Sequence, residues 1–131
     1  MPLSAEYREY LKDLFACIGP VSFKRAFSGE AMMAGGAMVG YFIRDKLHLR
    51  TDAETRPLYE AEGGEPFTFL KGTEVIVTSY MTLPERLFDE PDELAVWARR
   101  AYDAAQQSPS AVARRKKRAR ATAPSLKRSR R

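Results

Sequence analysis

The side chains best suited to bind another molecule lie together near the C-terminal end of the 131-residue chain. Between Ser108 and Arg131 there are ten Lys or Arg residues and no Asp or Glu. Cationic groups at this density attract phosphates, because each contact releases counterions from a polyanion. We therefore expect ten residues to bind nucleic acid: Arg114, Arg115, Lys116, Lys117, Arg118, Arg120, Lys127, Arg128, Arg130 and Arg131.

This expectation concerns affinity and not sequence preference, because phosphate contacts position a protein without reading bases. If about six to ten cations engaged phosphates, the affinity would fall roughly 10³- to 10⁵-fold between 50 and 200 mM salt. The alternatives are a solubilising tail without a ligand, a nuclear import signal in a eukaryote, and an acidic membrane surface as a less favoured polyanion. The segment 108–131 has almost no apolar content beyond alanine and is predicted to be a disordered tail.

The rest of the chain carries the opposite charge. Of the 22 Lys and Arg residues ten lie in the tail, so residues 1–107 hold the other 12 against all 17 acids, a net charge of −5. The whole-chain value of +5 thus describes neither part. A mildly acidic globular domain at 1–107 joined to a basic tail at 108–131 is the predicted organisation.

The domain itself offers little chemistry. His48 is the only histidine, and with no second ligand in sequence it is predicted to be an exposed strand residue rather than a metal ligand or a general base. Cys17, the only cysteine, is predicted to be a buried structural thiol. No P-loop, GxGxxG or GxSxG pattern is present. The sequence predicts no catalytic, metal-binding or cofactor-binding residue, and a protein that is not an enzyme.

Two groups of apolar residues admit both a structural and a binding interpretation. Three methionines flank a glycine pair, and core packing is favoured over a partner-binding groove. Three aromatic residues could belong to an RNA-binding sheet, but the RNP pattern is missing and the domain is acidic, so core packing is favoured again. The methionines are Met32, Met33 and Met38, and the aromatic residues are Phe67, Phe69 and Tyr80.

These residues must be positioned by helices and strands that hydrophobic periodicity and capping signals predict. A capping box at Thr51 and Glu54 indicates the second helix, and Gly35-Gly36 interrupts the second strand segment, as a bulge or as two pieces. Two runs of strands joined by short turns favour an α+β, two-layer fold with a five-stranded antiparallel sheet. The expected order is helix (4–18), three strands (23–27, within 32–43, and 47–50), helix (51–62), two strands (67–70 and 74–81) and helix (89–107).

The expected compartment is the cytoplasm. A single cysteine excludes an intrachain disulfide, which fits a reducing environment. The first ten residues lack the basic and apolar regions of a secretory signal, and no apolar run reaches the ~20 residues of a spanning helix. We therefore expect no membrane partner.

Several motifs together carry a resemblance to a known family. They are Arg25-Ala26-Phe27-Ser28-Gly29, the segment from Phe42 to Asp52, Glu65-Pro66-Phe67-Thr68-Phe69, and Pro91-Asp92-Glu93-Leu94 followed by Trp97 to Ala101. In order and spacing, residues 4–107 resemble the N-terminal domain of the TfoX/Sxy competence regulators, which are small bacterial proteins. The resemblance implies a two-layer antiparallel fold, a role in gene regulation linked to natural transformation, and no known catalytic residues.

The chain departs from the family pattern in two places. The pattern usually has paired glycines after the phenylalanine and a further glycine two residues on, where this chain has Ser28-Gly29 and Ala31. Longer members carry a second helical domain where this chain has the basic tail, so functions of that domain do not carry over.

Three functional hypotheses follow. The first is a regulatory adaptor whose acidic domain contacts a protein of the transcription machinery while the tail binds nucleic acid. The second is a protein-binding or chaperone-like module with an incidental tail. The third, a small-molecule or enzymatic site near Met32 to Met38, has no convergent titratable groups to support it.

Overall fold

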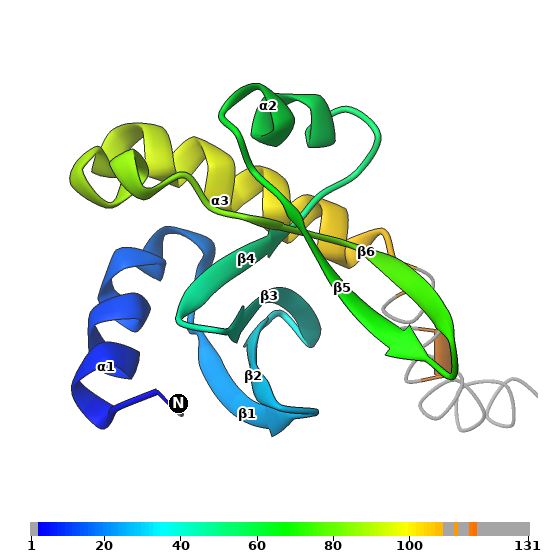
Figure 1. Cartoon of the computed structure of the whole chain (residues 1–131). Coiled ribbons are helices and arrows are strands. Elements are labelled where there is room, and N and C mark those ends of the chain that lie inside the picture. The colour runs from blue at the N-terminus through cyan, green and yellow to red at the C-terminus, as the bar shows by residue number, and fades with distance from the viewer. Residues whose placement is uncertain (1–2, 109–111, 113–115, 118–131) are drawn as a thin grey trace, which may run out of the picture.

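In the part of the chain that the structure describes, six strands form one antiparallel sheet in the order β1-β2-β3-β4-β6-β5, together with three α-helices and two short 3-10 helices. The computed structural model describes residues 3–108, 112 and 116–117 (Figure 1). The strands are β1 (Ser22–Ala26), β2 (Gly29–Ala34), β3 (Ala37–Ile43), β4 (Lys46–Arg50), β5 (Pro66–Lys71) and β6 (Glu74–Thr82). The helices are α1 (Ala5–Leu14), η1 (Ala16–Ile18), α2 (Arg56–Ala61), η2 (Glu85–Asp89) and α3 (Pro91–Gln106). The predicted α+β class with an antiparallel sheet is confirmed.

The predicted number of five strands is wrong, because the segment within 32–43 contributes to two strands. Gly35 and Gly36 have φ values of +58° and +77° and form the turn that reverses the chain between β2 and β3. The positive φ favours glycine at Gly35, and a Cβ atom there would lie 2.5 Å from the Tyr102 hydroxyl of α3, so that side chain would have to shift. The second strand also begins earlier than predicted. Gly29 and Glu30, which lie before the expected range within 32–43, belong to β2 and pair with Ala26 and Arg25.

One face of the sheet packs against the helices to form the core. Leu11 and Phe15 at the end of α1 are fully buried, as is Met32 on β2. Along β4 and β6 the alternation of side chains places Leu49 opposite Met81 on this face. The helix α3 contributes an apolar stripe at three- and four-residue steps, consisting of Leu94, Ala98, Ala101 and Ala105.

The N-terminal helix begins as predicted and ends earlier. The Ser4 hydroxyl accepts a hydrogen bond from the Tyr7 amide at 3.1 Å, which satisfies one free amide of the first turn. The helix ends at Leu14, and a 3-10 turn continues the chain to Ile18. This turn leaves Cys17 exposed, so the prediction of a buried thiol is wrong.

The second helix forms where predicted but without the predicted capping box. Thr51 donates its hydroxyl to the Ser79 carbonyl oxygen at 2.6 Å, so it ties β4 to β6 instead of capping a helix. The Asp52 carboxylate accepts the amides of Glu54 and Thr55 and shapes the turn that precedes α2. Within the described residues no helix has the length and apolar composition needed to cross a membrane.

An ion pair fastens α1 to the edge of the sheet. The Arg8 guanidinium donates from Nε and Nη2 to the two carboxylate oxygens of Glu30, at 3.0 and 2.6 Å. Glu30 also accepts the Leu3 amide at 3.2 Å, and only 3% of this residue is exposed. The arrangement satisfies a buried carboxylate with three donors.

Candidate ligand-binding cleft

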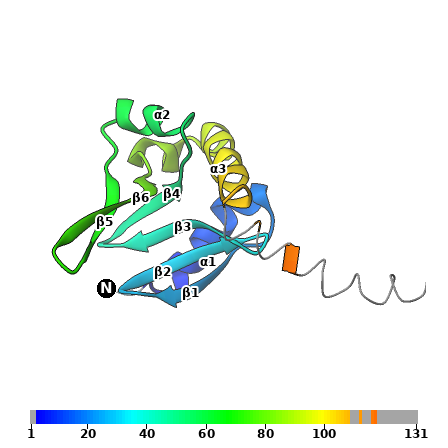
Figure 2. The same ribbon diagram turned by 90° about the vertical axis from the view of Figure 1, so that its right-hand side faces the viewer.

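The face of the sheet opposite the core carries aromatic side chains and cations. Side chains directly opposite each other on paired strands share a face. The register pairs Tyr41 with His48 and Arg50 with Tyr80, whereas the neighbours Leu49 and Met81 turn into the core. In Figure 2 the β5–β6 hairpin extends away from α1 and α3, so no helix covers this part of the sheet.

His48 lies on this face but is buried, which corrects the prediction of an exposed strand residue. It is 6% exposed, because the Phe67 ring of β5 packs edge-on against it with 5.9 Å between the ring centroids. The ring nitrogen Nδ1 lies 3.2 Å from the Tyr41 carbonyl oxygen. Burial lowers the pKa of His48, so the neutral form is favoured at neutral pH. Among the described residues no three His, Cys, Asp or Glu side chains gather as a metal site.

A cleft of about 320 Å³ opens beside His48 on the same face. Its aromatic lining forms a connected cluster: Tyr41 meets Phe67 edge-on at 5.0 Å, and Phe67 stacks with Phe69 at 6.2 Å and 25°. Phe69 is 44% exposed, so one part of this cluster is open to a ligand. The lining residues are Phe27, Ser28, Met38, Tyr41, Ile43, Arg44, Phe67, Phe69, Thr78 and Tyr80.

Three of the four residues with a hydroxyl group in the lining of the cleft donate that hydroxyl to the backbone. The Tyr41 hydroxyl donates to the Ala26 carbonyl oxygen at 2.9 Å, and the Tyr80 hydroxyl donates to the Met38 carbonyl oxygen at 2.8 Å. The Thr78 hydroxyl donates to the Phe67 carbonyl oxygen at 2.7 Å. Burial raises the pKa of both tyrosines, so their phenols stay protonated at neutral pH. The cleft therefore offers a ligand mainly contacts with aromatic rings and methyl groups, and few free hydrogen-bond donors.

Two arginines frame this apolar surface. The Arg44 guanidinium lies over the Phe67 ring at 5.7 Å, and the Arg50 guanidinium lies over the Tyr80 ring at 5.5 Å. Arg50 Nε is buried and has no hydrogen-bond partner among the described residues. None of the ten lining residues is an Asp or Glu, although residues 1–107 are acidic overall. Of these lining residues Arg44 is thus the one that is charged, and Arg50 lies beside the cleft over Tyr80.

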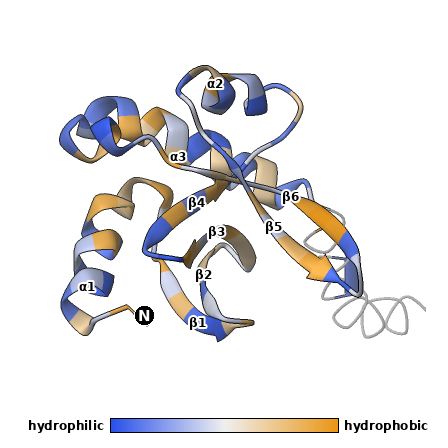
Figure 3. Cartoon of the chain, in the orientation of Figure 1, coloured by the Kyte–Doolittle hydropathy of each residue, from blue (hydrophilic) through white to orange (hydrophobic). Residues whose placement is uncertain are grey.

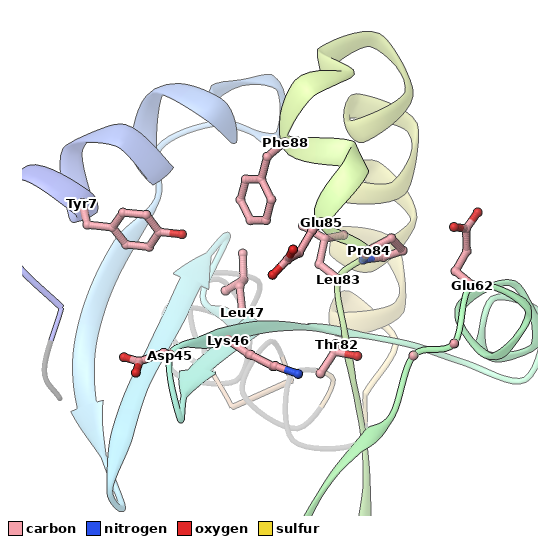
Figure 4. Close-up of a pocket in the computed structure, with 12 residues that line it drawn as sticks. Tyr7, Asp45, Lys46, Leu47, Glu62, Thr82, Leu83, Pro84, Glu85 and Phe88 are labelled. Atoms are coloured by element: carbon pink, nitrogen blue, oxygen red, sulfur yellow. The ribbon is translucent and has the colours of Figure 1, made fainter.

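A second cavity, of about 450 Å³, lies on the helix side between α1, the β3–β4 turn and η2 (Figure 4). Tyr7, Lys46 and Glu85 are its polar groups nearest the hollow in the figure, beside the Phe88 ring. Burial raises the pKa of Tyr7, and the charges of Tyr10 and Glu85 raise it further. No hydrogen bond of the described residues joins two side chains that line this cavity, so it holds no preassembled acid–base pair.

The charged groups beyond this cavity serve the fold. Arg86 on η2 binds the carboxylate of Glu62 at 2.7 Å and those of Glu90 and Glu93 at 2.8 Å. These hydrogen bonds raise the pKa of Arg86, with Glu93 the largest contributor, and join α2, η2 and α3. This cluster gives no support for a catalytic role, since all three carboxylates are engaged by the same Arg86 guanidinium in contacts between helices.

The predicted site residues and the cleft lie in different parts of the chain. Of the ten tail cations, Lys116 and Lys117 have helical backbone and exposed side chains, and the other eight lie outside the described residues. Sequence reasoning missed the cleft because it assigned Phe67, Phe69 and Tyr80 to the core, and none of the three belongs to the core cluster. The alternation along β6 was the available signal, because Tyr80 must face away from Met81.

A sheet covered by helices on one face and hollowed by an aromatic cleft on the other defines a two-layer α+β domain with a candidate ligand-binding site. The chain belongs to the TfoX N-terminal domain family, whose family model matches residues 13–105. That assignment confirms the resemblance found in the sequence and indicates a regulatory domain. A search of curated proteins gives no match to the chain.

Proposed function

We propose that this protein is a non-enzymatic regulator of the bacterial cytoplasm, which assists transcription linked to natural competence through contacts with a protein partner. In this proposal its basic tail holds nucleic acid without sequence preference. Membership of the TfoX N-terminal domain family supports the regulatory role. Among the described residues the candidate site offers rings and cations and no nucleophile–base pair, which supports binding over catalysis.

The division of charge is the observation that carries the nucleic-acid part of the proposal. Ten cations without an acid lie between Ser108 and Arg131, next to a domain with a net charge of −5. The tail attracts a polyanion, whereas the net charge of the domain does not, so the tail supplies most of the non-specific phosphate contacts in this proposal. Such a tail raises the local concentration of the domain at DNA, where it can meet a transcription protein.

A mobility-shift titration tests the tail. The truncated form should end after Ser108, because this residue is buried and its hydroxyl donates to the Ala105 carbonyl oxygen at 2.8 Å at the end of α3. A full-length form with all ten tail cations replaced by Gln serves as the matched control for tail length. We expect both variants to lose most duplex binding at about 50 mM salt, and the wild type to lose it between about 50 and 200 mM. If all three forms bound the duplex equally, or if the affinity of the wild type did not change with salt concentration, the proposed role of the tail would be refuted.

A second candidate function is a protein-binding module whose tail is incidental. The observation in its favour is an apolar hollow of about 280 Å³ between α2 and α3, lined by Tyr59 and Trp97. At its edge Leu58 and Val96 are 42% and 56% exposed. If this function is correct, Val96→Ser should reduce capture of RNA polymerase subunits in a pull-down, whereas Val75→Ser on the β6 strand and removal of the tail should not.

A further inference from the structure

We propose that the cleft on the helix-free face of the sheet binds single-stranded nucleic acid by stacking bases on its aromatic residues. This inference goes beyond the proposed function, because it requires neither the tail nor a transcription partner. It assigns a binding site to β3, β5 and β6, in the domain that is acidic overall.

The first argument is the exposed aromatic surface. Phe69 is 44% exposed and rests on Phe67, whose ring is held by Tyr41 and His48 through edge contacts. Because Tyr41 and His48 hold the Phe67 ring in place, the solvent-facing side of Phe69 and Phe67 forms a rigid surface on which a base can stack. Figure 3 shows apolar residues along the outer half of the β5–β6 hairpin, where Ile76 is paired with Phe69. Aromatic side chains held in this way are the usual platforms for unpaired bases.

The second argument is the geometry of Phe27. Its ring is 91% exposed at the β1–β2 turn, and its φ of +54° is a conformation that bulky residues rarely adopt. At this exposure the Phe27 side chain contributes little apolar burial to the fold. Phe27 lines the cleft, so its ring is available to close over a base that stacks there.

The third argument is charge. Arg44 lines both the cleft and an adjoining cavity of about 300 Å³, which adds Lys46 as a second cation and Glu65 as its one acid. His48 also lines that cavity, but burial lowers its pKa, so it is neutral at neutral pH and adds no charge. Arg50 lies beside Tyr80, and its Nε lacks a partner among the described residues. Phosphates that follow a bound base along the sheet would therefore meet cations at short intervals. Guanidinium groups over aromatic rings also stack on bases directly.

The same features distinguish a single strand from other ligands. In a duplex the faces of the bases are already stacked and only their edges are open, so an aromatic platform has nothing to bind. A volume of about 320 Å³ lies near the lower end of the range for small-ligand pockets, roughly 300–1,000 Å³, and suits planar rings. Because the hydroxyls of Tyr41, Thr78 and Tyr80 donate to backbone carbonyl oxygens, little polar readout remains. Binding is therefore tolerant of sequence.

The experiment uses the full chain with the ten tail cations replaced by Gln, so that the tail does not mask the cleft. Fluorescence anisotropy compares labelled oligothymidine with a duplex of equal length at low salt. We expect a preference for the single strand. Phe69→Ala should weaken single-strand binding about 5- to 100-fold and leave the weak duplex binding unchanged. Leu70→Ala is the matched control, because Leu70 is the next residue of β5 and is 68% exposed; this change should have no effect.

A charge variant tests the phosphate contact. Arg44→Gln should reduce the slope of log affinity against log salt by about 0.7 for a single strand, whereas Arg99→Gln on α3 should leave the slope unchanged. Phe69→Leu keeps an apolar residue in the strand, so it provides a folded test if Phe69→Ala unfolds. Undiminished binding by Phe69→Leu, equal losses for Phe69 and Leu70 variants, or tighter binding of an acidic aromatic peptide than of the oligonucleotide would overturn the proposal.

The two nucleic-acid proposals fail independently. Replacing the tail cations of the wild-type protein by Gln should weaken single-strand and duplex binding alike. Phe69→Ala in a chain that keeps the wild-type tail should weaken only single-strand binding. If neutralising the tail has no effect, the proposal that the tail binds nucleic acid is refuted. If Phe69→Ala has no effect on single-strand binding, the proposal that the cleft binds single strands is refuted.

Discussion

Replacing Glu30 by Gln tests how the N-terminal helix is held to the sheet. Glu30 lies on β2 with 4% of its side chain exposed and accepts three hydrogen bonds, two from Arg8 and one from the Leu3 amide. Glutamine has the same shape and keeps one acceptor oxygen. However, it removes the negative charge and turns an NH₂ group toward one of the donors.

The expected loss follows from the burial of the two partners. Removing one member of a fully buried ion pair costs about 3–5 kcal/mol. Here 34% of the Arg8 side chain is exposed, so water compensates part of the loss on that side. We expect Glu30→Gln to lower the free energy of unfolding by about 2 kcal/mol, which corresponds to a decrease in Tm of roughly 8 °C for a domain of this size.

The same contact predicts a dependence on pH. The Arg8 guanidinium lowers the pKa of Glu30, chiefly through its hydrogen bonds to the carboxylate. A carboxylate with a lowered folded-state pKa stabilises the protein fully above its unfolded-state pKa of about 4.3, and this contribution is lost as the pH falls through the folded-state value. The difference in Tm between wild type and Glu30→Gln should therefore be largest near pH 7 and should shrink below about pH 4.

Thermal unfolding of both forms across this pH range is the assay. Glu9→Gln is the matched control, because Glu9 lies on α1 with 71% of its side chain exposed and pairs only with Lys12 among the ion pairs described. Its effect should stay within about 0.5 kcal/mol. The reasoning would be refuted if Glu30→Gln unfolded like the control at pH 7, or if the difference from wild type persisted unchanged in acid.

Two further predictions concern the turn between β2 and β3 and the buried histidine. Gly35→Ala should lower the free energy of unfolding by about 2–3 kcal/mol in urea titrations, because a φ of +58° disfavours alanine and its Cβ would displace Tyr102 and Gln106. Gly72→Ala, with a φ of +66° but open space around it, should cost only about 1–2 kcal/mol, and equal costs would show that the α3 contact is unimportant. Because burial lowers the pKa of His48, wild-type stability should be complete above about pH 6.5 and decrease on acidification below it. His48→Gln should lose less stability than wild type between about pH 7 and 5, and identical pH profiles would contradict this assignment.

Local signals in the sequence predicted most of the helices and hairpin positions. The apolar steps from Tyr7 to Ile18 and from Leu94 to Ala105 predicted the first and last helices, because a helical period is visible within one segment. A short turn between the strand segments within 32–43 and at 47–50 was also expected, and Arg44 and Asp45 there have the positive φ values of a tight hairpin, +55° and +61°. The Gly35-Gly36 pair was ambiguous, since a bulge and a turn use the same residues.

The candidate site depended on pairings between distant segments. Alternation on β4 indicated that His48 faces away from Leu47 and Leu49, and this is correct. It did not show that Phe67, nineteen positions later, would cover His48 and bury it. The prediction of exposure failed because burial depends on what lies over a face, and the sequence of one strand does not contain that information.

By itself the sequence determined the charge division, the helix stripes, the strand segments and the family, because each is a property of neighbouring residues or of their order along the chain. Only the tertiary structure decided that β6 lies between β4 and β5 and that helices cover one face alone. Because of those long-range pairings, three residues that were expected in the core line a cleft beside Arg44 instead: Phe67, Phe69 and Tyr80. The physical reason is that a strand's alternation specifies two faces, while packing between distant elements determines which of them is buried.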